Sequence, residues 1–222
     1  MDLKSEERSV RVAVGSLSLE GSLILPEAAY GIVLFAHGSG SSRHSPRNRY
    51  VAQLLNGGKL ATLLVDLLTP AEEAIDLQTT HLRFDIGLLA ERLVGATNWL
   101  AVQPETRDLR VGYFGASTGA AAALVAATMR PQAVGAIVSR GGRPDLAGPE
   151  PLAHVQAPTL LIVGGNDTPV ITLNEMAYAL LCCEKRLVII PGATHLFEEP
   201  GALDAVAQLA CDWFQRHLRR TE

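Results

Sequence analysis

The sequence predicts an α/β fold with a mostly parallel sheet of about eight strands and helices on both of its faces. Short, continuous apolar runs alternate along the chain with longer segments of helical spacing. Strands that are apolar on both sides are typical of a parallel sheet buried between two layers of helices. Hydrophobic residues make up 48% of the 222 residues and charged residues 19%, which is enough apolar material for one large core. We therefore expect a single domain over residues 1–222.

Each predicted element has its own signal. Residues 9–14 and 17–25 flank Gly15-Ser16 and should form an antiparallel hairpin. Continuous apolar runs predict six further strands at residues 32–36, 60–65, 109–114, 133–138, 160–163 and 187–190. Helical spacing predicts helices at residues 46–55, 84–100, 118–129, 171–181 and 203–217. This alternation is typical of parallel strands joined by crossover helices.

Charge and cysteine usage exclude several classes of function. The chain has 19 Lys and Arg against 23 Asp and Glu, a net charge of −4, and it lacks a basic block that could follow a phosphate backbone, so nucleic acid is not an expected partner. The first ten residues are charged and the apolar runs are short, so we expect a cytoplasmic protein that does not associate with membranes. Cys182, Cys183 and Cys211 form neither a disulfide framework nor a metal-ligand pattern, and we expect buried thiols and no metal.

The segment Gly115-Ala116-Ser117-Thr118-Gly119 matches G-x-S-x-G between a predicted strand and a predicted Ala-rich helix. This context is typical of a nucleophile elbow, in which a sharp turn presents a serine hydroxyl above the sheet. The glycines permit the turn, and the helix N-terminus directs backbone N–H groups at a developing oxyanion. The alternative is a serine that only caps the helix.

A serine hydroxyl becomes a good nucleophile only beside a base, which a carboxylate must in turn orient. Asp167 and His195 follow the last two predicted strands, so both should lie at the same edge of the sheet as Ser117. The order Ser, Asp, His is the order of an α/β-hydrolase triad. Asp66 and Asp145 also follow apparent strands and are alternatives for the acid.

The loop after the third strand reads HGSGSS over residues 37–42, and its small residues allow the backbone to approach a ligand. We assign the oxyanion-binding N–H groups to Ser39 and Thr118. His37 is expected to hold the loop by hydrogen bonding. The chain contains neither G-x-G-x-x-G nor the P-loop pattern, so no nucleotide cofactor is expected.

Arginines on two loops should border the same site. Arg43 and His44 follow the oxyanion loop, and Arg140 follows the sixth strand. Guanidinium groups match carboxylates and phosphates, so these residues are candidates for binding an acidic substrate. The alternative is a solvated rim, since surface arginines are common. The same loops also carry Arg47, Arg49 and Arg143.

In its motifs HGSGSS, GASTG, GGND and PGATHLF the chain resembles the α/β-hydrolase superfamily, and more narrowly its dienelactone-hydrolase-related branch. The resemblance covers nearly the whole chain. It implies hydrolysis of a small carboxylic ester or lactone through an acyl-enzyme, without metal or other cofactor, with Ser117 as nucleophile, Asp167 as orienting acid and His195 as base. Dienelactone hydrolases proper carry cysteine where this chain has Ser117, so the substrate does not transfer with the resemblance.

Residues 140–158, where many relatives insert a lid domain, number fewer than twenty and leave no room for a helical cap. An open, shallow site of this kind favours small substrates. The same triad could act on a thioester or a peptide. A catalytically silent hydrolase fold used for binding is a further alternative, which the complete triad argues against. The sequence does not indicate an oligomeric state.

Overall fold

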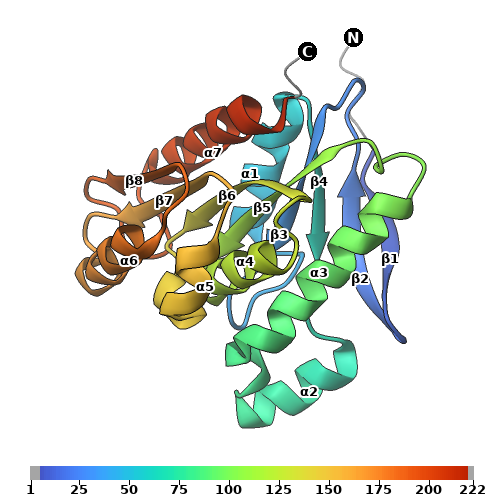
Figure 1. Cartoon of the computed structure of the whole chain (residues 1–222), viewed down its shortest axis with the longest axis horizontal. Coiled ribbons are helices and arrows are strands. Elements are labelled where there is room, and N and C mark those ends of the chain that lie inside the picture. Colours follow the sequence, from blue (N-terminus) through green and yellow to red (C-terminus); the bar gives the residue numbers. More distant parts are fainter. Residues whose placement is uncertain (1–5, 220–222) are drawn as a thin grey trace.

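The computed structural model describes residues 6–219 and contains an eight-stranded sheet (Figure 1). Residues 1–5, half of the charged N-terminal segment, lie outside the described residues. The order across the sheet is β1-β2-β4-β3-β5-β6-β7-β8. β1 pairs antiparallel with β2, β2 pairs antiparallel with β4, and the remaining neighbours are parallel, which confirms the predicted α/β fold and its leading hairpin. The strands are β1 (Arg8–Val14), β2 (Leu17–Ile24), β3 (Gly31–Ala36), β4 (Leu60–Val65), β5 (Arg110–Ala116), β6 (Val134–Arg140), β7 (Thr159–Gly164) and β8 (Lys185–Ile190).

Five of the α-helices match predicted segments: α1 (Pro46–Gly57), α3 (Ile86–Val102), α4 (Thr118–Met129), α6 (Thr168–Leu180) and α7 (Ala202–Leu218). Two further helices, α2 (Pro70–Thr79) and the short α5 (Pro149–His154), were not predicted from the sequence. α2 begins with a capping box, in which the Thr69 hydroxyl accepts the N–H of Glu72 and the Glu72 carboxylate accepts the N–H of Thr69. Among the described residues, no helix combines the length and the apolar character needed to cross a bilayer.

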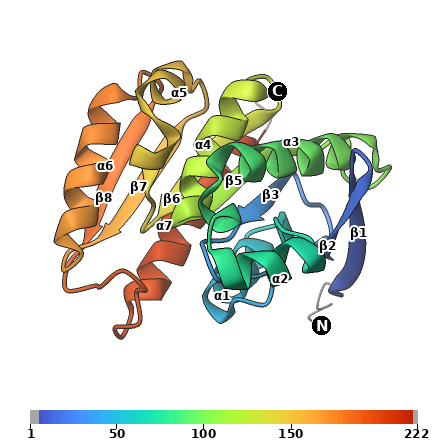
Figure 2. The same ribbon diagram turned by 90° about the horizontal axis from the view of Figure 1, so that it is seen from below.

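The helices cover the sheet in two layers (Figure 2). The larger cluster of buried side chains joins the sheet to α3 and α4, and the smaller cluster joins it to α1 and α7. Because successive side chains of a strand point to opposite faces, Tyr113 belongs to the first cluster and Phe114 to the second. β5 is therefore packed on both faces immediately before the residues that should carry the chemistry.

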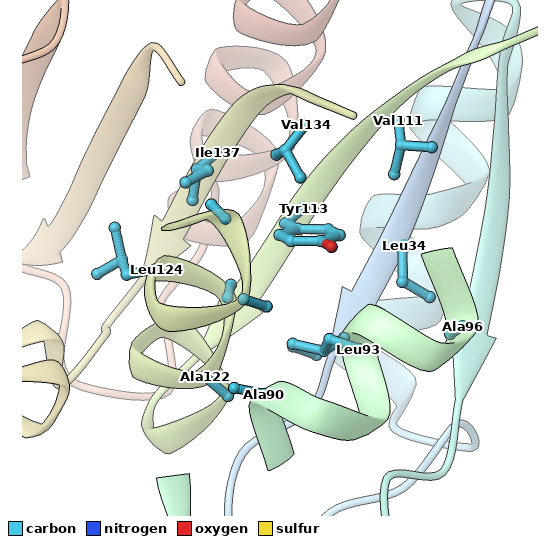
Figure 3. Close-up of a cluster of buried hydrophobic side chains, with 14 of the residues drawn as sticks. Leu34, Ala90, Leu93, Ala96, Val111, Tyr113, Ala122, Leu124, Val134 and Ile137 are labelled. Atoms are coloured by element: carbon cyan, nitrogen blue, oxygen red, sulfur yellow. The ribbon is translucent and has the colours of Figure 1, made fainter. Parts of the chain in front are cut away.

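Tyr113 lies in the centre of the larger cluster, among side chains of β3, β5, β6, α3 and α4 (Figure 3). Its hydroxyl lies 2.6 Å from the Thr97 Oγ1, which itself donates to the carbonyl of Leu93, so the Tyr113 hydroxyl is the donor. Burial raises the pKa of Tyr113 to about 12. Because its hydroxyl is hydrogen-bonded to Thr97 and its ring is fully buried, Tyr113 fixes the position of β5 relative to α3.

Candidate active site

Ser117 occupies a strained turn between β5 and α4. Its φ of 50° and ψ of −121° lie outside the backbone regions that residues with a side chain normally adopt. Such a conformation typically costs roughly 1–3 kcal/mol. A Cβ on Gly115 would lie 2.4 Å from the Ala120 Cα, and one on Gly119 would lie 2.2 Å from the Ala36 carbonyl oxygen. The turn is thus possible only because both motif glycines lack side chains. The Ser117 side chain forms no capping hydrogen bond to α4, so the structure does not support the capping alternative.

The segment that follows β6 holds the backbone of Ser117 in place. The Ser117 N–H donates to the Arg140 carbonyl at 3.3 Å, and the Ser117 carbonyl accepts the Arg143 N–H at 3.0 Å. Gly141, between these residues, has a φ of +49°, and a Cβ at this position would lie 3.1 Å from the His195 carbonyl oxygen and 3.5 Å from its Nδ1. Ser117 and His195 therefore lie against the same short turn.

Asp167 and His195 form a hydrogen-bonded pair at the carboxyl ends of β7 and β8. His195 Nδ1 lies 2.7 Å from Asp167 Oδ2. Asp167 is the residue before α6 but makes no capping bond with its side chain, so its carboxylate serves the imidazole instead. A proton on Nδ1, donated to Asp167, leaves Nε2 as the acceptor nitrogen. A Cβ on Gly164 would lie 2.5 Å from the Ala193 carbonyl oxygen, so a close approach of the two loops makes the pair possible.

The two alternative acids, Asp145 and Asp66, are both paired with arginine side chains. Both carboxylate oxygens of Asp145 accept hydrogen bonds from Arg143, at 2.9 and 2.7 Å. Asp66 accepts the backbone N–H of Arg43 at 2.6 Å and forms an ion pair with its guanidinium. Of the three candidates, Asp167 is the one whose carboxylate hydrogen-bonds to a histidine.

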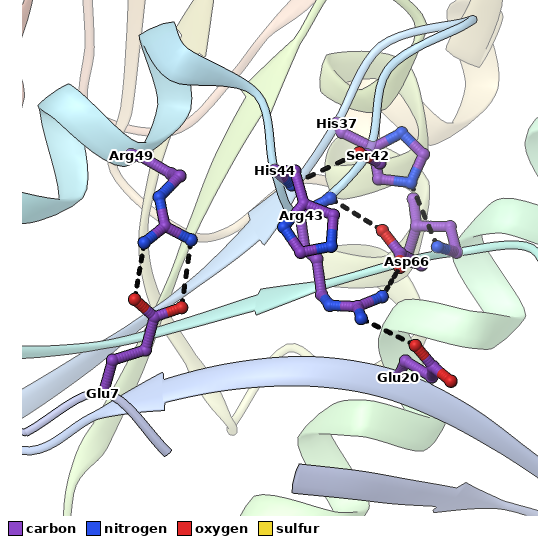
Figure 4. A network of polar contacts seen from close by, with 9 residues as sticks. Glu7, Glu20, His37, Ser42, Arg43, His44, Arg49 and Asp66 are labelled. Atoms are coloured by element: carbon purple, nitrogen blue, oxygen red, sulfur yellow. Dashed lines mark hydrogen bonds and ion pairs between the residues drawn. The ribbon is translucent and has the colours of Figure 1, made fainter. Parts of the chain in front are cut away.

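His37 fixes the predicted oxyanion loop as expected. Its Nε2 accepts the Leu67 N–H at 3.1 Å on the side of the ring that faces Asp66 in Figure 4. Its Nδ1 lies 3.0 Å from the Gly38 carbonyl, to which it donates. Burial lowers the pKa of His37, which agrees with a neutral ring that accepts one hydrogen bond and donates another. A Cβ on Gly38 would lie 3.0 Å from the Ser117 Cβ. The loop therefore packs directly against the elbow.

A cavity of about 300 Å³ opens beside the elbow, and both Ser39 and Thr118 line it. Thr118 is the first residue of α4, and the N–H groups of a first helical turn have no acceptor within the helix. The opposite wall comes from α2, α3 and the short 3-10 helix at Leu82–Phe84. The lining side chains on that wall include Leu68, Glu73, Asp76, Leu77, Arg83 and Leu89.

α2 supplies a cavity wall that was not predicted from the sequence. The absence of a cap over residues 140–158 holds, because this segment contains only a 3-10 turn and the six-residue α5. The wall beside the oxyanion loop arises elsewhere, between β4 and α3, where α2 stands off the sheet at the bottom of Figure 1. The Thr69-Pro70 pair followed by Glu72 is the sequence signal that could have located it.

The three predicted substrate-binding residues lie in different settings. Arg43 pairs with Asp66 and, at 2.6 Å, with Glu20 (Figure 4), so its guanidinium braces the loop onto β2 and β4 and is not free for a substrate. His44 is exposed, and its backbone N–H donates to the Ser42 hydroxyl at 3.2 Å. Arg140 is buried and faces Asn48 at 3.5 Å.

Residues 6–219 bring together no group of three His, Cys, Asp or Glu side chains that could hold a metal ion. The expectation of buried thiols is correct for Cys211 and wrong for Cys182, which is exposed because it follows the end of α6, while Cys183 is half-buried. Burial raises the pKa of the Cys211 thiol.

Comparison with known proteins agrees with the resemblance. Residues 50–220 match the model of the dienelactone hydrolase family. A crystal structure of a dienelactone hydrolase from Anabaena variabilis is 67% identical, with a TM-score of 0.96 over 97% of this chain and 100% of that one. Est1E from Butyrivibrio proteoclasticus shares 14% identity and a TM-score of 0.75 over 93% of this chain and 99% of its own, which shows a common fold.

A Mycobacterium tuberculosis protein, provisionally named a phosphoribosyl transferase, is 59% identical over 216 residues, which are 97% of this chain and 47% of that protein. An uncharacterised protein of the same organism is 34% identical over 60% of this chain and 53% of its own length. The chain thus spans about half the length of the curated relatives it matches. Because the family model covers residues 50–220 and a dienelactone hydrolase has a near-identical fold, the chain belongs to the dienelactone hydrolase family.

Proposed function

We propose that this protein is a serine hydrolase that cleaves a small carboxylic ester or lactone through an acyl-enzyme intermediate. The observation that carries the proposal is the 2.7 Å hydrogen bond between Asp167 and His195 beside the strained turn at Ser117. A serine that only shaped the turn would need neither partner. Membership of the dienelactone hydrolase family supports hydrolytic chemistry at this position.

In the proposed mechanism, His195 Nε2 takes the hydroxyl proton of Ser117 as Oγ attacks the substrate carbonyl carbon. Asp167 holds the imidazole by its Nδ1–H and stabilises the imidazolium that forms. The backbone N–H groups of Ser39 and Thr118 stabilise the negative oxygen of the tetrahedral intermediate. The carbon–oxygen bond to the leaving alcohol then breaks, and the alcohol departs with the proton from His195.

A water molecule completes the cycle by the same steps in reverse order. His195 takes a proton from the water, whose oxygen attacks the acyl carbon, and the bond from that carbon to the Ser117 Oγ breaks as the proton returns to Oγ. The products are a carboxylic acid and an alcohol, or a hydroxy acid from a lactone. No redox step or external cofactor enters this sequence.

The proposed small substrate follows from the cavity. A volume of about 300 Å³ lies at the lower end of the range for small-molecule sites. Its wall mixes leucines with the ion pair between Arg83 Nε and Asp76 Oδ2, 2.5 Å apart. A short acyl chain fits such a space better than a long lipid tail.

The 67% identical dienelactone hydrolase from Anabaena variabilis supports an ester-type bond, because a lactone is a cyclic ester. A dienelactone hydrolase-like promiscuous phosphotriesterase and a carboxyl esterase are under 25% identical to this chain and share its fold. The phosphoribosyl transferase name belongs to proteins about twice as long as the matching segment.

A substrate panel separates this function from its alternatives. Wild type and Ser117→Ala would be compared on a short-chain aryl ester, a small lactone, an acyl thioester and a peptide anilide. We expect the ester or lactone to give the highest kcat/KM and the variant to lose it. Preference for the thioester or anilide would reassign the substrate class. No turnover of any substrate by folded wild type would favour a silent binding fold.

A further inference from the structure

Asn174 is a fully buried polar residue on the inner face of α6, which lies beside β7 and β8 (Figure 2). The buried positions of this helix are Val170, Asn174 and Ala177, and their spacing of four and three residues places them on one face. Two of the three are apolar, as expected for a face that packs against a sheet. A buried amide is costly unless its polar atoms find partners, so the hydrogen bonds of Asn174 indicate why the residue is tolerated there.

The side-chain amide of Asn174 joins α6 to a second element. Its Nδ2 donates to the Val170 carbonyl of the same helix at 2.8 Å and to the Gly142 carbonyl at 3.0 Å. Its Oδ1 is buried and has no hydrogen-bond partner within residues 6–219. The donor side of the amide is thus satisfied and the acceptor side is not. The bond to Gly142 is therefore the contact that an apolar residue at this position could not supply.

Gly142 belongs to the turn of residues 140–143, which we call the β6 turn. The N–H and the carbonyl of Ser117 are hydrogen-bonded to the first and last residues of this turn, at 3.3 and 3.0 Å. A Cβ on Gly141, inside the turn, would lie 3.1 Å from the His195 carbonyl oxygen. The β6 turn is therefore in contact with two members of the proposed triad.

α6 is connected to the third member. Asp167 is the residue before this helix, and its carbonyl accepts the Ile171 N–H of the first turn at 3.0 Å. Seven positions, about two helical turns, separate Asp167 from Asn174 along the same helix. The bond from Asn174 to Gly142 thus links the helix that follows Asp167 to the turn that contacts Ser117 and His195.

The β6 turn is closely packed on its other sides. A Cβ on Gly142 would lie 2.0 Å from the Ser139 Oγ and 2.6 Å from the Ala120 Cβ, so the turn lies tightly against β6 and α4. A backbone hydrogen bond of 2.8 Å joins it to β7. Among the described residues, no backbone N–H donates to the Gly142 carbonyl. The amide of Asn174 is thus the donor that holds this carbonyl to α6.

We propose that Asn174 is a positioning residue of the hydrolase, whose bond to Gly142 sets the position of the nucleophile relative to the base. This inference rests on the proposed hydrolase function. Asn174 does not line the cavity beside the elbow, so it acts through the β6 turn and not on the substrate. A misplacement of about 1 Å between reacting groups can cost a hundredfold in rate. Loss of the bond should therefore lower kcat and leave KM nearly unchanged.

Asn174→Ser separates the two hydrogen bonds of the amide. A serine hydroxyl in a helix can donate to the carbonyl four residues before it, which keeps the bond to Val170, but it is too short to reach Gly142. We expect kcat on a short aryl ester to fall about ten- to a hundredfold, with KM within about threefold of wild type. A higher KM with an unchanged kcat would overturn the proposal.

Counting active sites distinguishes a slower enzyme from a less folded one. A fluorophosphonate would be titrated against wild type and Asn174→Ser, and kcat would be expressed per labelled serine. A positioning role lowers the labelling rate and kcat per labelled site, while the labelled fraction stays near that of wild type. A purely structural role would lower the labelled fraction or the melting temperature and leave kcat per labelled site unchanged. That result would overturn the proposal.

Asn56→Ser is the matched control. The Nδ2 of Asn56 in α1 also donates two bonds, to the Leu60 carbonyl at 2.9 Å and to the Thr62 Oγ1 at 3.1 Å. Because β3, β4 and β5 are parallel, the beginning of β4 lies at the opposite edge of the sheet from the elbow. The change should lower the melting temperature and keep the wild-type kcat per labelled site. An equal fall of kcat per site in both variants would contradict a role specific to Asn174.

The same assay separates this inference from the function on which it rests. If folded wild type takes no label and turns over no ester, the proposed function and the positioning role both fail. If wild type is labelled and active and Asn174→Ser matches both of its rates, the positioning role fails and the hydrolase function stands. Slower labelling and a lower kcat per site in Asn174→Ser, with KM retained, support the role.

Discussion

His195 Nδ1 and Asp167 Oδ2 lie 2.7 Å apart, although 28 positions separate the residues along the chain. The pair forms because β7 and β8 are parallel neighbours, so the loops that leave them meet at one edge of the sheet. Asp167→Asn should keep the fold and lower kcat by roughly a thousandfold or more, since an amide favours the wrong tautomer of the imidazole. Hydrolysis of a short aryl ester, with circular dichroism to check folding, measures both effects.

Asp145→Asn is the matched control for this change. Asp145 also follows a strand but hydrogen-bonds to Arg143 through both oxygens. We expect it to retain most of the wild-type kcat. A large loss of kcat in Asp145→Asn, with little change in Asp167→Asn, would show that Asp145 and not Asp167 orients the histidine.

Gly119→Ala should disrupt the elbow. The new Cβ would lie 2.2 Å from the Ala36 carbonyl oxygen and 2.6 Å from that of His37, and backbone atoms cannot rotate away. Overpacking of this kind typically costs about 1–3 kcal/mol. Urea unfolding should show this loss, and ester hydrolysis should fall with it because the oxyanion loop must shift.

Gly57→Ala is the corresponding control, since a Cβ there meets nothing within 4 Å and the residue ends α1. Replacing glycine by alanine in a helix gains about 0.5–1 kcal/mol. Unchanged activity and equal or greater stability are expected. A stability loss in Gly57→Ala equal to that in Gly119→Ala would argue against a specific steric conflict at the elbow.

Chain-length preference should follow the cavity volume of about 300 Å³. Among p-nitrophenyl esters, acetate to hexanoate should be the best substrates, and dodecanoate should be poorer by roughly tenfold or more. Leu68 lines the cavity, so Leu68→Trp should lower kcat/KM for the butyrate more than for the acetate. Highest activity on dodecanoate would be incompatible with this cavity as the substrate pocket.

His37 should make the fold sensitive to mild acid. Burial lowers its pKa below the ordinary 6.5, so the unfolded chain binds a proton that the folded chain refuses. The contribution of neutral His37 to the free energy of unfolding is therefore complete above pH 6.5. It is lost as the pH falls from 6.5 toward the lower pKa of His37 in the folded protein. Between pH 7.5 and 5.5, the free energy of unfolding should fall less in His37→Asn than in wild type.

His44→Asn is the control for this pH dependence, because it removes an exposed histidine from the same segment. It should keep the wild-type slope of unfolding free energy against pH. His37→Asn also loses the hydrogen bond to Leu67 and will be less stable at every pH, so the slope is the informative quantity. An unchanged slope in His37→Asn would mean that His37 is not held neutral.

The parts of the site that the sequence could predict are those with local patterns. Ser117 lies in a motif whose glycines are needed for the turn itself, and Asp167 and His195 directly follow apolar runs. α2 was harder to recognise, because Asp76 is its one buried residue while Ile75 and Leu77 are 52% and 71% exposed. A helix without a buried apolar stripe lacks the periodic signal from which helices are predicted.

The roles of the arginines could not be separated from sequence because their partners are distant in the chain. Arg43 and Arg140 both come after predicted strands, so the sequence around them gives no sign of their different roles. Arg43 meets Glu20 only because β2 pairs with β4, where the Asp66 N–H donates to the Glu20 carbonyl at 2.9 Å. Within residues 6–219, Arg140 forms no ion pair with an acidic side chain, and its side chain hydrogen-bonds to Asn48. That difference exists only in the folded protein.

The most direct test of the proposed function is the intact mass of the protein after treatment with a fluorophosphonate, which labels an activated serine without knowledge of the true substrate. We expect a single adduct on wild type and none on Ser117→Ala, with both proteins shown to be folded by circular dichroism. An adduct that persists in Ser117→Ala, or no adduct on folded wild type, would contradict the claim that Ser117 is an activated nucleophile.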